Sequence, residues 1–229
     1  MMPLPNGPDC LGEAQSGCTQ SGPHRRSQSV LLHALLLTAL LAGCRLLPAP
    51  QADPAHFYAL GEKTPAAAQT VTGTLRIGLR PVELPSYLQT RAMVVRVGSE
   101  IRYEQNRRWA EPLDEAVARI VRTHLLATPT VATVYPTPFP IGEPRDYDVT
   151  LRVQRCEGAR DATGKAVALF AATIEITRAD TGRAVVLRRN ISPPGAAWDG
   201  KDFSVLANLL GDAVAALRPE IAGALPTAK

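Results

Sequence analysis

The chain of 229 residues has few cysteines, few histidines and only 5% aromatic residues. Of its four cysteines, Cys10, Cys18 and Cys44 lie within or directly after an N-terminal segment that we expect to be removed or modified. Only Cys156 then remains, so the folded part can form no intramolecular disulfide. Its stability must therefore come from a hydrophobic core, which a chain of this length can supply in one domain.

The common catalytic motifs are missing as well. The sequence has no Gly-x-Ser-x-Gly elbow, no phosphate-binding loop, no dinucleotide fingerprint and no metal ligands at paired spacing. His124 falls on the apolar face of a predicted helix, and Cys156 lies in a predicted strand, where packing explains both. Asp114 and Glu115 suit the first turn of that helix. We expect no enzyme, no metal and no cofactor, with an unrecognised active site as the alternative.

The excess of positive over negative charge is small. The formal net charge is +4, and residues 1–43 hold two acidic and two basic residues, so the remainder keeps this balance. No basic cluster is interleaved with aromatic residues, which argues against nucleic acid as a partner. Weak attraction to anionic lipid headgroups stays open.

The N-terminal region has the pattern of a secretory signal. Arg25 and Arg26 precede an apolar run over 30–42, which is too short to cross a bilayer, because spanning takes roughly 20 residues and a signal about 7–15. The quartet Leu41-Ala42-Gly43-Cys44 resembles a bacterial lipobox. That resemblance implies cleavage before Cys44 and covalent diacylglyceryl and N-acyl groups on it. The alternative is an ordinary signal cleaved near Ala42.

Lipidation would fix the location of the chain. Two or three acyl chains on Cys44 hold a protein to a membrane essentially permanently, and everything after Cys44 should then face the periplasm. Arg45 resembles the default sorting to the outer membrane, since the usual inner-membrane retention signal is an Asp there. We therefore expect the inner leaflet of the outer membrane.

We predict three parts: a signal peptide with a long leader over 1–43, a lipidated tether over 44–73 and a domain over 74–229. The tether is rich in proline and alanine and contains one apolar island, His56-Phe57-Tyr58-Ala59-Leu60. The island suits a short edge strand that docks on the domain, and a partner-binding peptide is the alternative.

Apolar periodicity predicts an α+β domain with a mostly antiparallel sheet of about six or seven strands, covered on one face by two helices. Helical spacing favours helices over 113–126 and 203–217, the second capped by Asp202, with Pro219 ending or kinking it. Alternating apolar residues predict strands over 75–79, 93–97, 101–103, 131–135, 147–154, 166–177 and 183–191.

Two segments carry a family resemblance. Leu-Arg-Ile-Gly-Leu-Arg-Pro-Val-Glu-Leu-Pro-Ser-Tyr-Leu over 75–88 and Arg-Trp-Ala-Glu-Pro-Leu-Asp-Glu-Ala-Val over 108–117 resemble the ABC-type transport auxiliary lipoproteins. This family includes the lipoprotein of a paraquat-inducible MCE transport system. The resemblance implies an MCE-domain periplasmic protein and inner-membrane transport components as partners in lipid transport. The leader before Arg25 departs from the family, and a start codon assigned too far upstream would explain it.

Two sets of residues are candidates for partner binding. Arg107, Arg108 and Trp109 precede the first helix and could form an exposed corner for a partner or for headgroups, whereas packing is the alternative for Trp109. Val167 and Leu169 make one end of the outer strand face apolar. They would bind the partner or a second copy of the chain if the helices cover the opposite face. A lipoprotein that assists outer-membrane assembly or envelope integrity, with no transporter, is the alternative function.

Overall fold

A computed structural model describes residues 33, 53–61, 73–161, 163–180 and 182–226. The chain divides into two compact units, Met1–Asp53 and Pro54–Lys229, and the folded domain lies in the second. The predicted signal peptide, apart from His33, and the predicted lipidation site Cys44 lie outside the described residues.

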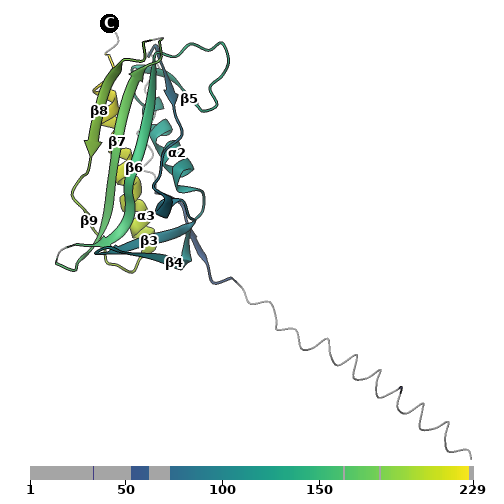
Figure 1. Ribbon diagram of the computed structural model, residues 1–229, viewed down its shortest axis with the longest axis vertical. Helices are drawn as coiled ribbons and strands as arrows, with labels where there is room; N and C mark the ends of the chain where they lie inside the picture. The colour runs from purple at the N-terminus through teal and green to yellow at the C-terminus, as the bar shows by residue number, and fades with distance from the viewer. Residues whose placement is uncertain (1–32, 34–52, 62–72, 162, 181, 227–229) are drawn as a thin grey trace, which may run out of the picture. The chain divides into compact units, whose positions relative to one another are not determined.

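The described residues form one nine-stranded sheet, in which β6, β7 and β8 run side by side in front of the helices (Figure 1). The strands are β1 (His56–Tyr58), β2 (Leu75–Leu79), β3 (Ala92–Val97), β4 (Glu100–Trp109), β5 (Val131–Pro136), β6 (Tyr147–Arg160), β7 (Ala166–Arg178), β8 (Val185–Ile191) and β9 (Ala196–Ala197).

Strand β6 is the centre of the sheet. One of its edges pairs with β7 in antiparallel fashion over almost its whole length. Its other edge pairs in parallel with β2 near Tyr147 and with β3 near Gly158. Outward from these, β5 flanks β2, β4 flanks β3 and β1 flanks β4, while β8 and β9 flank β7.

The predicted α+β class is confirmed, but the sheet is mixed rather than mostly antiparallel, and it has more strands than the predicted six or seven. Four strand pairs are parallel, namely β1–β4, β2–β5, β2–β6 and β3–β6. Strands β2 and β3 both run in the direction of β6, which gives two of these pairs. Helix α2 carries the chain from β4 to β5 as a crossover, so β5 can run parallel to β2. Alternating residues identify a strand but not its neighbour.

Two helices cover one face of the sheet, α2 (Leu113–Leu126) and α3 (Phe203–Ala215). Helix α2 has the predicted bounds and carries Asp114 and Glu115 in its first turn. Helix α3 is capped by Asp202, as predicted, and a break at Ala216 separates it from α4 (Leu217–Ala222). The break follows from Pro219, because its ring would clash with the carbonyl four residues earlier in a continuous helix.

The core lies between the helices and the inner sheet face. The even-numbered residues of β7 from Ala168 to Ile176 are buried. Trp198, which directly follows β9, is also buried, and it packs edge-on against Phe203 with ring centroids 5.2 Å apart. Gly158 makes room for this indole, because a Cβ at position 158 would lie 2.7 Å from Trp198 Cζ3.

The predicted docking strand is β1, and it continues into a segment that we call the strap, Tyr58–Gly61. The Ala110 N–H donates to Tyr58 O (2.9 Å), and the Gly61 N–H donates to Ala207 O on α3 (3.2 Å). Leu60 is buried between these contacts. The strap therefore fixes the start of the domain to both β4 and α3.

Candidate functional site: a groove beside helix α2

A surface groove runs between helix α2 and the segment that joins β2 to β3. It consists of two adjoining pockets of about 400 and 360 Å³, and Val82 and Asp114 line both of them. The larger pocket reaches the end of β5, and the smaller one reaches the residues before β3. The groove therefore runs along the whole length of α2, to Leu126.

The sheet side of the groove is an extended segment held on β6. The Arg80 N–H donates to Val149 O (2.9 Å), and the Glu83 N–H donates to Leu151 O (2.9 Å). Pro81 lies between these two bonds and fixes φ there without needing a donor. One edge of the segment is thus occupied by β6, and its side chains border α2.

The helix side is a stripe of residues one turn apart. Asp114, Ala118 and Arg122 recur at i, i+4 and i+8, so they share one face of α2. Ala118 faces Leu79 and Val82 across the groove, while the charged members stand at its rim. The groove consequently has an apolar floor and a rim with both signs of charge.

A buried carboxylate orients Arg80 at one border of the groove. The Asp148 side chain is only 5% exposed and accepts from Arg80 Nη2 (2.7 Å) and Arg145 Nε (2.9 Å). Phe139 lies against both guanidinium groups, 5.7 and 3.9 Å from its ring centroid. Gly78 leaves the space for this cluster, because a Cβ there would lie 2.4 Å from Asp148 Oδ1.

A second buried carboxylate lies on the same face of β6 as Asp148, the face turned away from the helices. The Glu157 side chain is fully buried and accepts from Arg96 Nε at 2.5 Å. Arg96 also lies 5.1 Å from the ring centroid of Tyr87. Burial, together with the neighbouring Glu157 carboxylate, raises the pKa of Tyr87 to about 12. This hydroxyl stays protonated at neutral pH and donates to Gln154 O (2.9 Å).

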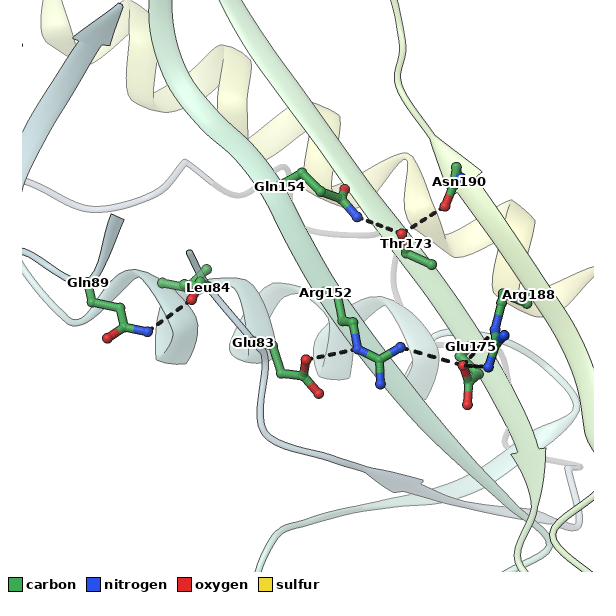
Figure 2. A network of polar contacts seen from close by, with 9 residues as sticks. All are labelled: Glu83, Leu84, Gln89, Arg152, Gln154, Thr173, Glu175, Arg188 and Asn190. Carbon is green, nitrogen blue, oxygen red and sulfur yellow. Dashed lines mark hydrogen bonds and ion pairs between the residues drawn. The ribbon is translucent and has the colours of Figure 1, made fainter. Parts of the chain in front are cut away.

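The outer face of the sheet is a polar surface (Figure 2). Arg152 on β6 pairs with Glu83 (2.8 Å) and approaches Glu175 on β7 (3.6 Å), which in turn pairs with Arg188 on β8 (2.6 Å). A parallel row of hydrogen bonds joins Gln154, Thr173 and Asn190. These charged and polar side chains make the face a solvated surface rather than part of the core. Exposed ion pairs of this kind contribute at most about 1 kcal/mol each to stability.

The first predicted partner site, Arg107, Arg108 and Trp109, is only partly exposed. Trp109 is 3% exposed, and its backbone N–H donates to Arg91 O (2.7 Å). The packing interpretation of Trp109 is therefore the correct one, and its proposed contact with a partner is wrong for this fold. Arg107 and Arg108 are half-buried, and the Arg107 guanidinium lies 5.8 Å from the Phe203 ring centroid.

The second predicted site, Val167 and Leu169, lies on the outer face, opposite the helices. Both residues are half-buried, because the segment between β8 and β9 lies against them. A Cβ at Gly195 would be 2.9 Å from Leu169 Cδ2 and 3.1 Å from Val167 Cβ. The open apolar surface is thus smaller than the sequence indicates, and partner binding there stays a prediction.

The remaining candidate residues, His124 and Cys156, are buried, as packing residues would be. His124 is buried on α2, and burial raises the pKa of the Cys156 thiol to about 12, which keeps it protonated. Within the described part of the chain, no group of His, Cys, Asp and Glu could hold a metal ion. No helix in the same ranges is long and apolar enough to cross a membrane.

Comparison with known proteins identifies the family. The family model described as the ABC-type transport auxiliary lipoprotein component matches residues 58–222. The chain belongs to this family. The resemblance seen in the two sequence segments is thereby confirmed, and the family description is that of a transport component. No curated protein matches the chain.

Solved structures share the fold of this auxiliary lipoprotein. A crystal structure of protein XCC0632 from Xanthomonas campestris, assigned to DUF330, has a TM-score of 0.62 at 17% identity and covers 74% of this chain and 93% of its own. A second crystal structure, of an uncharacterized protein, has a TM-score of 0.57 at 14% identity and covers 74% and 97%. A PelC dodecamer from Paraburkholderia phytofirmans is more distant, with a TM-score of 0.40 at 14% identity and coverage of 65% and 93%.

The groove was not predicted from the sequence, although the segments that line it had been singled out there. The segment over 75–88 and the start of α2 carry the family resemblance, and the structure brings them together as the two walls of one groove. The stripe of Asp114, Ala118 and Arg122 was the available signal, because a helix buried on one face only must show another face to solvent or to a partner.

Proposed function

We propose that the protein is an outer-membrane lipoprotein, anchored in the inner leaflet by acyl chains on Cys44, and a non-catalytic auxiliary component of an MCE-type transport system that moves lipids between membranes. The family match over 58–222 supports the transport role. The lipobox supports the anchor, and Arg45 supports the outer membrane. In this role the domain binds protein partners in the periplasm and carries out no chemistry.

The observation that carries the proposal is that the family segments form the groove. Its apolar floor and mixed rim suit an extended segment of the MCE-domain partner, whose side chains would alternate between the floor and the charged rim. The elongated form of two adjoining pockets supports an extended segment rather than a compact ligand.

Blocking the groove tests this role. Ala118→Arg places a long side chain over the floor, on an α2 face that already carries Arg122, so the helix should tolerate it. Val186→Arg is the matched control, because Val186 is 42% exposed on β8, outside the groove. We expect the Ala118 variant, and not the control, to lose co-purification with the MCE-domain protein encoded by a neighbouring reading frame, at unchanged melting temperature. Equal co-purification of both variants would contradict the groove, and none with the unaltered protein would favour an envelope role without a transporter.

The anchor is tested separately. Mass spectrometry of the protein extracted from membranes should find an acylated Cys44 at the N-terminus, whereas an unmodified N-terminus elsewhere would rule out the lipobox. Replacing Arg45 with Asp should move the protein toward the inner-membrane fraction in a density gradient. An unchanged distribution would mean that residues other than Arg45 decide the sorting.

A further inference from the structure

The helix wall of the groove carries its charges in a fixed order. Asp114 stands in the first turn of α2 and Arg122 in its second half, with the methyl group of Ala118 between them, and all three line the larger pocket. Eight residues of an α-helix rise by about 12 Å. The wall therefore presents a negative, an apolar and a positive position at even intervals.

The two charged side chains have no partner of their own. Neither Asp114 nor Arg122 makes a side-chain hydrogen bond or an ion pair with any residue that the structure describes. Glu115 adds a second negative charge at the same end of the larger pocket, whereas Arg91 lines only the smaller pocket, on the far side of Asp114 from Arg122. The stretch from Asp114 to Arg122 is thus open to groups of opposite charge at both ends.

The other guanidinium groups on this stretch are already paired. Arg80 Nη2 lies 2.7 Å from Asp148 Oδ2, and Arg119 Nη2 lies 2.8 Å from Glu111 Oε1. A charge that is already neutralised attracts a further charge less strongly. Arg122 is consequently the guanidinium that an incoming carboxylate can reach without displacing a partner.

The spacing along the helix matches that of an extended chain. Alternate residues of a strand point to the same side and lie about 6.6 Å apart, while Asp114, Ala118 and Arg122 follow one another at about 6 Å along the helix axis. Three alternate residues of a segment that runs along α2 would face these positions in turn. The two residues between them would face the opposite wall, where Leu79 and Val82 are apolar.

We infer that the groove selects its segment of the MCE-domain partner by charge order, with a basic residue against Asp114, an acidic residue four positions away against Arg122 and apolar residues facing the opposite wall. This inference rests on the proposed function, because it describes the segment that the groove would hold. Either chain direction satisfies the order, since side chains are read and β6 occupies the backbone edge of the sheet wall. Segments with like charges at the two positions are rejected, because one of the charges is then repelled.

Charge reversal at two ionic strengths tests the order. The affinity of the full acylated chain in detergent is measured for the intact MCE-domain protein encoded by the neighbouring reading frame. Arg122→Glu should weaken binding about tenfold at low ionic strength and much less at high ionic strength, where salt screens the contact. Asp114→Asn should weaken it several-fold with the same salt dependence. Lys165→Glu is the matched control and should change nothing, because Lys165 is exposed between β6 and β7, outside the groove.

A compensating reversal in the partner identifies the segment. Lysine is placed, one position at a time, at each acidic residue of the MCE-domain protein that lies four positions from a basic residue. One such change should restore most of the affinity for Arg122→Glu and weaken binding to the unaltered chain. An unchanged affinity of Arg122→Glu or Asp114→Asn, a loss that does not depend on salt, or failure of every reversal to restore binding would overturn the inference.

The Ala118→Arg variant separates the two possible failures. If it binds the MCE-domain protein as well as the unaltered chain does, the groove is not the docking site and the proposed function fails together with the charge order. If it loses binding while Arg122→Glu keeps full affinity, the groove is the docking site and only the charge order is wrong.

Discussion

The side chain of Asp202 caps the N-terminus of helix α3. Asp202 Oδ1 accepts from the Ser204 N–H (2.8 Å), from the Ser204 hydroxyl (2.6 Å) and from the Val205 N–H (3.4 Å). Asp202→Ala should therefore lower the free energy of unfolding by about 1 kcal/mol in urea titrations, and Asp202→Asn by less, because an amide oxygen still accepts. Equal losses in the two variants would mean that the charge, and not the hydrogen bonds, matters.

The same cap predicts a pH dependence. The hydrogen bonds from Ser204 hold the pKa of Asp202 below its usual value of 3.8. The folded-state pKa is depressed, so the stabilisation is complete above the ordinary Asp value and is lost as the pH falls through the lowered one. The difference in unfolding free energy between the unaltered protein and Asp202→Asn should stay constant from neutral pH down to that region and then shrink. A difference that shrinks already near neutral pH would contradict the assignment to Asp202.

The buried Arg96–Glu157 pair predicts unequal losses. The Glu157 side chain is 0% exposed and that of Arg96 is 20% exposed. Removing the arginine strands a buried carboxylate, whereas Arg96 without its partner can turn toward water. Arg96→Ala should cost about 3 kcal/mol or more of unfolding free energy, and Glu157→Ala clearly less. A larger loss for Glu157→Ala would show that Arg155, 3.9 Å from the carboxylate, takes over the pairing.

At the scale of elements, the contact between the strap and α3 predicts an unusual effect of a helix mutation. Gly→Ala inside a helix normally stabilises by about 1 kcal/mol. Gly211→Ala should instead destabilise, because the new Cβ would collide with Gly61 O. We expect a lower melting temperature and faster proteolytic cleavage near the strap. A rise in melting temperature would show that the strap detaches at little cost.

Helix α2 and the hairpin of β3 and β4 could be predicted from the sequence because their signals are local. Apolar spacing and Pro112 define α2, and Gly98 occupies a left-handed position in the hairpin turn. Parallel pairing could not be predicted in this way, since it depends on where the chain returns after α2. The burial of Trp198 was equally invisible, because it needs the absence of a side chain at Gly158, 40 residues earlier (198 − 158).

At the scale of the whole molecule, the described domain has two distinct surfaces, the groove beside α2 and the polar outer face of the sheet. Family membership could be predicted from the segments over 75–88 and 108–117, because the resemblance is carried by the residues themselves. The groove could not be predicted, because it exists only when these two segments, which the β3–β4 hairpin separates in the chain, lie side by side. Val82 of one segment and Asp114 of the other then line both pockets. The packing interpretation of Trp109 is confirmed by its burial, but the neighbours that bury it, β1 and the Arg91 backbone, could not be predicted from the sequence pattern.

Site-specific photocrosslinking in cells tests the central claim most directly. A photoreactive amino acid at position 118, inside the groove, should crosslink to the MCE-domain partner in membranes from cells that contain acylated Cys44. The same amino acid at position 186 on β8 should give no such product. Crosslinks to the partner from position 186 but not from position 118, or no crosslink from either, would contradict the account.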